Sequence, residues 1–269
     1  MKNKKVLVIV FSICLISFGN WFFCKSQTAN QENMKSKEME NYLRTADIVS
    51  IEKDESAGRT APWRINLDDG KIARQGHFKH VNRLRPSLFP ADSYKYDIAA
   101  YELDKLLDLN IVPPIVEREI EGTKGSLQLF LEGIITENER KMKNIDPPDL
   151  KVFKNNLEVI NIFENLVYDE DCLDPDDNLI NMEDWRVWRV DFSMAFSLTP
   201  ELIPGCKITR CSKKLYKNLQ KLESEAVKAK LNPYLNDEEI EALLKRKNVI
   251  TDTIQQLIKE KGEASVLFQ

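Results

Sequence analysis

The sequence has no surplus of positive charge and few of the residues that mark special classes of protein. Its 269 residues contain 39 Lys and Arg against 43 Asp and Glu, a formal net charge of −4, and only two His. A chain with this charge has no general electrostatic attraction for nucleic acid, so DNA or RNA binding is not expected. Glycine and proline are also few, at 9 and 11, while hydrophobic residues make up 42%. This composition is that of a globular protein and excludes a disordered or collagenous chain.

The usual signatures of metal sites are absent as well. There is no Cys-x-x-Cys pair, and His77 and His80 have no thiolates or carboxylates at the spacing of a zinc site. The acidic stretch from Asp169 to Asn178 lacks the glycine and the glutamate that an EF-hand needs. Taken alone, this stretch is a solvated loop or a calcium site of another kind.

The amino-terminal residues are typical of an exported protein. Lysines precede an apolar run from Val6 to Phe23, and polarity returns at Lys25. The run is long for a signal peptide and short for a membrane-spanning helix, which needs about 20 residues, so residues 1–26 are a signal peptide or a membrane anchor. A buried core helix is the alternative. Positive charge before the run predicts that the rest of the chain is extracytoplasmic, in the periplasm, free or anchored in the inner membrane. Residues 27–41 are polar and predict a flexible tether.

Three of the five cysteines belong to the part of the chain that should fold, and they give limited information. An exported chain meets oxidants, so Cys206 and Cys211, five residues apart after a Pro-Gly turn, could form a disulfide. The alternative is that both are free thiols.

The pattern of apolar residues predicts an α+β protein with two lobes. In residues 42–135, short alternating runs favour an antiparallel meander over 46–81, and helical spacing favours a helix over 94–107. Two more strands are expected at 111–120 and 125–131. Residues 136–269 are expected to be mainly helical, with a short strand pair at 179–180 and 185–190. Residues with capping chemistry predict helix starts at Ser212, at Asn236 with Glu239, and at Thr251.

A set of polar residues occurs in the order that phosphoryl transfer from ATP requires. The chemistry needs a lysine that neutralises phosphate oxygens, a carboxylate that orients the attacking hydroxyl, and an Asn and an Asp that hold metal ions. A glycine near the phosphates and an acidic partner for the lysine complete the set. In chain order the candidates are Gly58, Lys79, Asp97, Asp171, Asn178 and Asp191. Each also has a plainer reading, such as an exposed strand lysine for Lys79 or a solvated helix residue for Asp97.

Several segments around these residues resemble a bacterial group of atypical kinase-like proteins. This group is similar in plan to the HipA toxin kinases, the phosphatidylinositol 3- and 4-kinases and the secretory-pathway protein kinases. The resemblance covers residues 43–265 and is most specific over residues 97–107 and 178–191. Its segments are residues 43–46, 58–63, 78–79, 96–103, 112–114, 125–128, 163–166 and 188–196.

The resemblance implies a two-lobed kinase-like fold with a nucleotide between the lobes, and ATP with Mg or Mn as cofactors. It implies that Lys79 contacts the ATP phosphates and that Asp97, where relatives usually have Glu, is its acidic partner. Gly58 would lie beside the phosphates. Leu131 and Glu132 would form the hinge where the adenine ring pairs with backbone groups.

The same resemblance implies a phosphotransferase that acts on a protein or lipid-like hydroxyl. Asp171 would orient the acceptor, while Asn178 and Asp191 would hold the metal ion. The loop departs from the group at Cys172 and Leu173, because a basic residue commonly follows the catalytic Asp there, and extra carboxylates crowd it. Two alternatives therefore stay open. One is a catalytically inactive, kinase-like binding module, or pseudokinase, at the cell envelope, and the other is an envelope protein that binds divalent cations without nucleotide.

Overall fold

The computed structural model describes residues 36–53, 61–85, 91–169 and 174–269. The chain divides into two units, Met1–Glu38 and Met39–Gln269. Residues 36–38 are the described part of the first unit and are helical, so the expected signal peptide or anchor lies outside the described residues. Within the described ranges, no helix is both long enough and apolar enough to cross a membrane.

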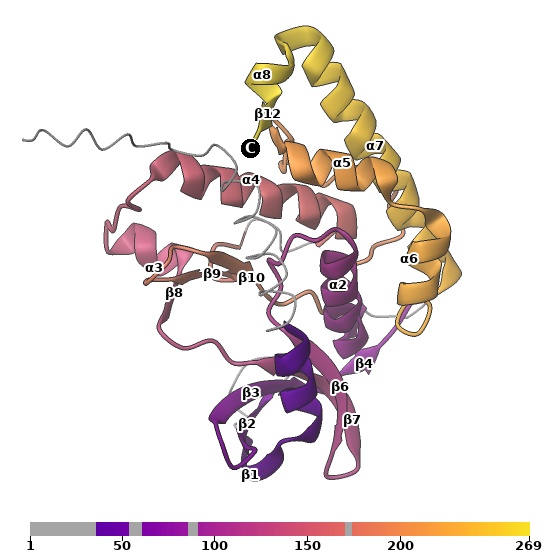
Figure 1. Cartoon of the computed structure of the whole chain (residues 1–269). Helices are drawn as coiled ribbons and strands as arrows, with labels where there is room; N and C mark the ends of the chain where they lie inside the picture. The colour runs from indigo at the N-terminus through magenta and orange to yellow at the C-terminus, as the bar shows by residue number, and fades with distance from the viewer. Residues whose placement is uncertain (1–35, 54–60, 86–90, 170–173) are drawn as a thin grey trace, which may run out of the picture. The chain divides into compact units, whose positions relative to one another are not determined.

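Five antiparallel strands form the main sheet of the second unit, in the order β1-β2-β3-β7-β6 (Figure 1). The strands are β1 (Asp47–Lys53), β2 (Trp63–Asp68), β3 (Ala73–Lys79), β6 (Ile115–Ile120) and β7 (Thr123–Leu129). The predicted meander is confirmed for β1 to β3, and its residues 54–60 lie outside the described residues.

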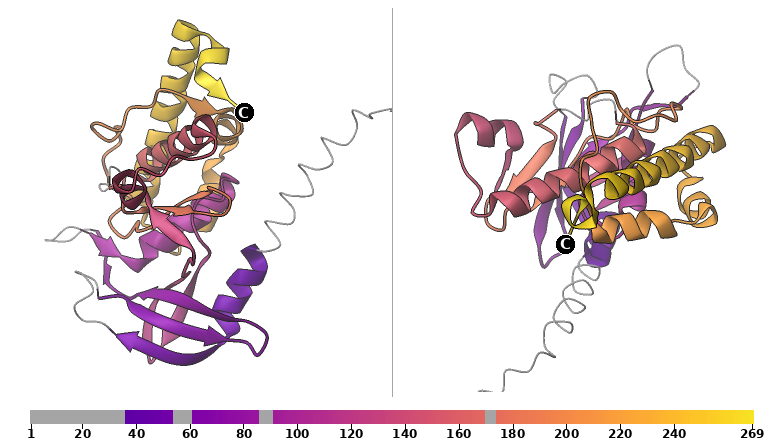
Figure 2. Two further views of the ribbon diagram at one scale, coloured as in Figure 1. Left: turned by 90° about the vertical axis from the view of Figure 1, so that its left-hand side faces the viewer. Right: turned by 90° about the horizontal axis from the view of Figure 1, so that it is seen from above.

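One face of this sheet is apolar, as expected for strands whose side chains alternate between a core and a polar face. Ile65, Phe78 and Leu127 form a small core there with Tyr42 and Leu43. The latter two belong to a helical segment, residues 39–45, which lies against the sheet in Figure 2. Part of the stretch expected to be a tether is therefore helical in this structure.

Helix α2 (Tyr94–Leu106) follows a short antiparallel ladder of β4 (Asn82–Arg83) and β5 (Asp92–Ser93). Ser93 caps the helix by accepting a hydrogen bond from the Lys95 amide, which confirms the helix predicted over 94–107. Near the other end, the Asp104 carboxylate accepts hydrogen bonds from the amides of Ile111 and Val112, at 3.2 and 3.3 Å. The Ile111 carbonyl in turn accepts one from the Arg189 amide at 2.8 Å. The loop after α2 is thus fixed to the second half of the unit.

A second, three-stranded antiparallel sheet has the order β10-β9-β8. Its strands are β8 (Ile134–Thr136), β9 (Asn178–Asn181) and β10 (Val187–Arg189), and between β8 and β9 the chain forms α3 (Glu137–Met142) and α4 (Leu150–Val167). The expected strand pair is confirmed as β9 and β10, with shorter bounds. Helix α4 buries Ile160, Phe163 and Leu166, the side chains of its apolar stripe.

Helices make up most of residues 211–269, as predicted. They are α5 (Lys213–Lys221), α6 (Ser224–Leu231), α7 (Asp237–Lys261) and α8 (Glu263–Val266), with a parallel pair of β11 (Cys211–Ser212) and β12 (Leu267–Phe268). The caps expected at Ser212 and at Asn236 with Glu239 are confirmed. The helix start expected at Thr251 is wrong, because α7 continues through it and the Thr251 hydroxyl donates to the Asn248 carbonyl at 2.9 Å.

Both expectations for the two later cysteines are wrong. Cys206 is disulfide-bonded, and Cys211 is a free, buried thiol. The two cysteines therefore do not pair with each other, and they are not both free. The physical reason is the position of Cys211 in β11, where its side chain packs into the main core formed by α2, α4 and the later helices. Burial raises the pKa of the Cys211 thiol to about 12.

Candidate functional site

Lys79 is the centre of an ion-pair cluster. It is the last residue of β3, where it pairs with Ser126 of β7, and its side chain is 12% exposed. Its ammonium nitrogen lies 3.1 and 3.3 Å from the two carboxylate oxygens of Asp97 and 2.8 Å from Oδ1 of Asp191. Burial alone would lower the pKa of Lys79, but Asp97 and Asp191 outweigh burial and raise it above its ordinary value. The lysine is therefore a fixed positive charge.

Asp97 lies in the first turn of α2 and points from the helix to the end of β3. Its side chain is buried, and its Oδ1 also accepts a hydrogen bond from the Phe192 amide at 2.9 Å. Burial raises the pKa of Asp97 to about 6, although Lys79 acts in the opposite direction. Despite being shorter than Glu, Asp97 reaches the lysine and also fixes the chain just after Asp191.

Asp191 lies two residues beyond the end of β10 and is half exposed, so one side of the cluster is open to solvent. Its backbone has a φ of 62°, in the left-handed region that few non-glycine residues adopt. The neighbouring Lys79 lowers the pKa of the Asp191 carboxyl well below its ordinary value, against the opposing effect of burial. The turn therefore presents an ionised carboxylate at the end of a strand.

Asn178 begins β9 and pairs with Arg189 in the β9–β10 ladder, two residues before Asp191. The Val190 amide donates to the Asp177 carbonyl at 3.1 Å. This hydrogen bond holds the residue before Asn178 beside the residue before Asp191. Within the described part of the chain, the buried Oδ1 of Asn178 has no hydrogen-bond donor. This atom is available as an oxygen ligand.

Asn178 and Asp191 carry the kind of oxygen donors that Mg²⁺ prefers, and Mg²⁺ is often held by one or two carboxylates plus substrate phosphates. No group of three or more His, Cys, Asp or Glu side chains in the described ranges could hold a metal by itself. A metal here would therefore depend on oxygen atoms of a bound phosphate as well as on the protein.

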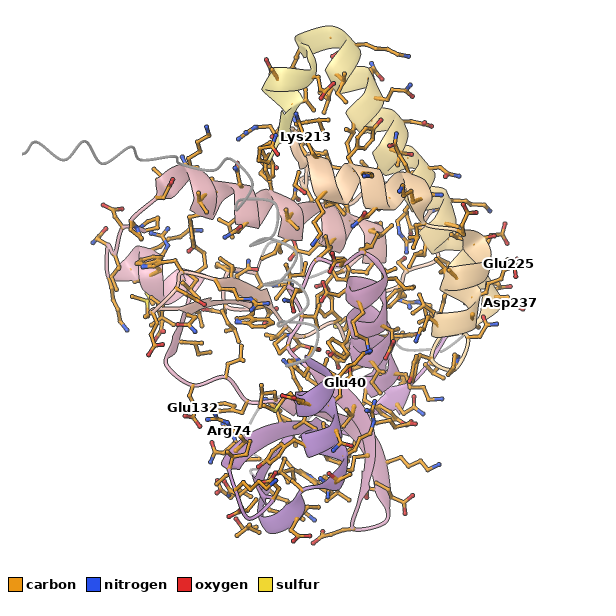
Figure 3. The ribbon with its side chains drawn as sticks, in the orientation of Figure 1. Glu40, Arg74, Glu132, Lys213, Glu225 and Asp237 are labelled. Atoms are coloured by element: carbon orange, nitrogen blue, oxygen red, sulfur yellow. The ribbon has the colours of Figure 1, made fainter. Side chains whose placement is uncertain are left out.

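Three further predicted site residues remain, and only one of them is described. Gly58 and Asp171 lie outside the described residues. Glu132 is exposed and lies on the chain segment between β7 and β8, where Figure 3 labels it. Among the residues that the structure describes, none forms a hydrogen bond or ion pair with its side chain.

The sheet face that carries Lys79 is polar. Paired residues of an antiparallel ladder point to the same face, and His77 pairs with Arg64 on β2 and with Gln128 on β7. The Arg64 guanidinium lies 3.8 Å from the ring centroid of Phe130. Burial, with the charges of Lys79 and Arg64, lowers the pKa of His77 to about 4, so this imidazole is neutral at pH 7. A ligand held by Lys79 would therefore meet neutral and cationic hydrogen-bonding groups on this face.

Arg189, which was not among the predicted site residues, is fully buried at the centre of a second ionic cluster. Its Nε lies 2.9 Å from Glu164, and its Nη2 lies 2.8 Å from Asp169 and 3.5 Å from Asp177. Burial raises the pKa of Glu164 to about 8 and that of Asp177 to about 7, since three carboxylates share one guanidinium. The available signal was an arginine inside the otherwise apolar run 187–190, beside a stretch rich in Asp.

Two solved structures resemble this chain at low sequence identity. A hydra Fam20 protein with sugar gives a TM-score of 0.62 at 15% identity, with 85% of this chain and 90% of that one covered. A Golgi casein kinase gives a TM-score of 0.62 at 13% identity, with 87% of this chain and 79% of that one covered. No protein-family model and no curated protein matches the chain. The expected likeness to secretory-pathway kinases is confirmed at the level of the fold, while the likeness to HipA and phosphatidylinositol kinases stays a prediction. The chain therefore has a mixed α/β, kinase-like fold.

Proposed function

We propose that the chain is an ATP- and Mg²⁺-dependent phosphotransferase, an atypical kinase that acts on a hydroxyl group of a protein or lipid-like acceptor. The observation that supports this proposal is the meeting of Lys79, Asp97 and Asp191 from β3, α2 and the end of β10. Phosphoryl transfer depends on positioning and on electrostatic stabilisation of phosphate oxygens rather than on covalent chemistry by the protein. A lysine held charged between two carboxylates, with one side open to solvent, suits that task.

In this proposal, Lys79 binds oxygens of the nucleotide phosphates and Asp97 keeps its ammonium group in place. Asn178 and Asp191 hold the metal ion, which when bound neutralises charge on the phosphates. Asp171, placed by the sequence in the loop before β9, orients the acceptor hydroxyl and accepts its proton.

The remaining parts of the nucleotide have proposed contacts as well. Backbone groups at Leu131 and Glu132 bind the base, and Gly58 lies beside the phosphates. The base and ribose would also meet the polar sheet face at His77 and Arg64. Apolar side chains line most small-molecule sites, so hydrogen bonds would carry more of the base recognition here than is usual.

Thermal unfolding of the full chain with ATP and MgCl₂ tests the proposal. At about 100 times Kd, a ligand specific for the folded state raises Tm by roughly 5 °C or more. Lys79→Met should abolish this shift, whereas Lys124→Met, at an exposed position of β7, should keep it. If Lys79→Met does not fold, Lys79→Arg, which keeps the positive charge, replaces it in this test. No shift in the wild-type chain, or an equal shift in Lys79→Met, would overturn the proposal.

The crowding of carboxylates favours one second candidate, a pseudokinase. Asp177 lies close enough to Asp191 and to Asp174 for both to raise its pKa, and this negative charge would repel phosphate, which could leave nucleotide binding without transfer. Transfer of label from γ-labelled ATP to protein or lipid acceptors separates the kinase from the pseudokinase. Stabilisation by calcium alone, without nucleotide, would instead support a divalent-cation-binding protein.

We propose that this activity is extracytoplasmic. Residues 1–26 have the pattern of an export signal or anchor. The disulfide at Cys206 supports this location, because disulfides persist mainly in oxidising compartments. Fractionation of cells that express the full chain checks it, since a protein found only in the cytoplasm with Cys206 reduced would contradict export.

A further inference from the structure

Arg189 occupies a position where a charged side chain is costly. It lies in β10 between Trp188 and Val190, and its side chain is 0% exposed. Moving a charged guanidinium from water into the protein interior costs on the order of several kcal/mol, unless hydrogen-bond acceptors and opposite charges surround it. A buried arginine therefore needs a set of acceptors built around it.

That set of acceptors comes from both sides of the acidic loop. On one side, Arg189 Nη2 donates to Oδ2 of Asp169 at 2.8 Å, just after α4. On the other side, Nη1 donates to the Asp174 carbonyl at 3.1 Å, and Nη2 lies 3.5 Å from Asp177. Glu164, on the last turns of α4, completes the cluster at 2.9 Å. One guanidinium thus joins the end of α4 to the chain that leads into β9.

The same residue lies between the two residues proposed to hold the metal. Asn178 directly follows Asp177, which contacts the guanidinium, and Asn178 itself pairs with Arg189 in the strand ladder. Asp191 comes two residues after Arg189, just beyond the end of β10. A change in how the guanidinium contacts Asp177 would therefore shift Asn178 relative to the end of β10 and to Asp191.

The negative charge of the acidic loop also bears on the role of Arg189. The loop carries Asp169, Asp174, Asp176 and Asp177 and has no basic residue of its own between Asp169 and Asn178. A loop with this charge beside a phosphate site repels the ligand, unless a nearby cation offsets part of it. Arg189 is a cation that contacts the described ends of this loop, and it comes from the neighbouring strand.

We propose that Arg189 is the positioning residue of this site, which holds Asn178 and Asp191 in place for the metal ion and supplies the positive charge that the acidic loop lacks. The inference rests on the proposed function and adds a determinant of metal use to it. Residues that hold metal ligands in place typically change metal affinity by about 10- to 100-fold when they are replaced.

The test compares Arg189→Lys with Arg246→Lys in the full chain. Lysine keeps the charge but loses the forked geometry that contacts several acceptors at once. Arg246 is a matched control because it is equally buried and donates to the carbonyls of Leu166, Ser197 and Thr199, outside the cluster around Arg189. Asp169→Asn, which keeps the shape but removes one partner charge, is the second variant if Arg189→Lys does not fold.

Two readouts are needed. The first is the Mg²⁺ concentration that gives half of the ATP-dependent rise in Tm, which should increase about tenfold in Arg189→Lys and stay within about twofold in Arg246→Lys. The second is amide hydrogen exchange of residues 174–181 without nucleotide, which should become faster in Arg189→Lys only. In Asp169→Asn both changes should have the same direction and be smaller.

Unchanged exchange of residues 174–181 in Arg189→Lys and Asp169→Asn would overturn the inference, whether or not the chain binds nucleotide. Faster exchange with an unchanged Mg²⁺ requirement would reduce Arg189 to a structural residue and also overturn it. If the wild-type chain shows no ATP-dependent stabilisation, the proposed function fails. The amide hydrogen exchange of residues 174–181 still decides whether Arg189 holds the loop.

Discussion

The ammonium nitrogen of Lys79 lies 2.8 Å from Oδ1 of Asp191, although 112 positions separate the two residues in the chain. Each holds the other in its charged form, because the pKa of Lys79 is raised and that of Asp191 is lowered. Because the pKa of Asp191 is lowered in the folded chain, its ion pair with Lys79 adds to the free energy of unfolding at any pH above the ordinary pKa of Asp, about 4. This contribution is lost only in stronger acid. At neutral pH, neither of these two side chains has to gain or lose a proton before a phosphate or a metal ion binds.

Replacing Asp97 with Asn should weaken nucleotide binding more than it weakens the fold. Asn has the same size and can still accept the hydrogen bond from the Phe192 amide, but it has no charge to hold Lys79. Loss of a charge-assisted hydrogen bond of about 1.4 kcal/mol corresponds to a roughly tenfold rise in the Kd for MgATP, measured by calorimetry. Asp104→Asn is the control on the same helix, since Asp104 is equally buried and contacts backbone amides instead of Lys79. An equal rise in Kd in both variants would mean that the substitutions act by disturbing α2 and not by releasing Lys79.

Asp191→Asn should fold normally and lose the effect of magnesium. Asn tolerates the left-handed backbone at this position, whereas Ala there costs on the order of 1 kcal/mol. The variant lacks the carboxylate charge, so MgATP should stabilise it no more than ATP with a chelator does, as thermal unfolding can show. Asp176→Asn, at an exposed loop position, should retain the magnesium effect. A full magnesium effect in Asp191→Asn would remove this residue from the proposed metal site.

Glu164→Gln should make the stability of the protein less dependent on pH. Burial raises the pKa of Glu164 to about 8, so the folded chain binds its proton more tightly than the unfolded chain does. The free energy of unfolding therefore falls as pH rises from the ordinary pKa of Glu, about 4.3, towards 8. Gln cannot ionise, and the variant should gain at least about 1 kcal/mol over the wild type between pH 6 and pH 9, since one pKa unit has that value. Urea unfolding at several pH values measures this, with Glu158→Gln on the same helix as control, and parallel curves for Glu164→Gln and wild type would contradict it.

Cys206→Ser should lower the free energy of unfolding by about 2–4 kcal/mol, because a disulfide restricts the unfolded chain. Dithiothreitol should lower the Tm of the wild type to that of the variant and leave the variant unchanged. Cys211 should resist iodoacetamide until the protein unfolds, since its thiol is buried and its raised pKa keeps it protonated. Rapid alkylation of Cys211 in the folded protein would contradict its place in the core.

Local patterns predicted much of the fold because local interactions form it. The helix after Ser93 and the capping box of Asn236 and Glu239 are made by residues within one turn of each other, so the sequence shows them directly. Thr251 failed as a helix start for a related reason. Its hydroxyl can cap a new helix or donate to a carbonyl of the preceding turn, and the core contacts of Ile250 and Ile254 keep α7 continuous there.

Contacts between distant segments were harder to predict. Lys79, Asp97 and Asp191 were expected to act together only through the order of residues and a resemblance, and their meeting depends on the packing of β3, α2 and β10. Arg189 was missed because nothing next to it in the sequence shows that Glu164 and Asp169 lie beside it. Local spacing also could not show that Cys211 points into the core, since this depends on the pairing of β11 with β12 at the end of the chain.

Helix α2 is attached at both ends to the chain around Asp191. Near its start, Asp97 holds Lys79 and the Phe192 amide, and near its end Asp104 holds the loop whose Ile111 carbonyl binds the Arg189 amide. An outward rotation of α2 would have to break these links at the same time. The charged residues are thus assembled as soon as the chain folds, so the proposed function would need no swing of α2 to bring them together.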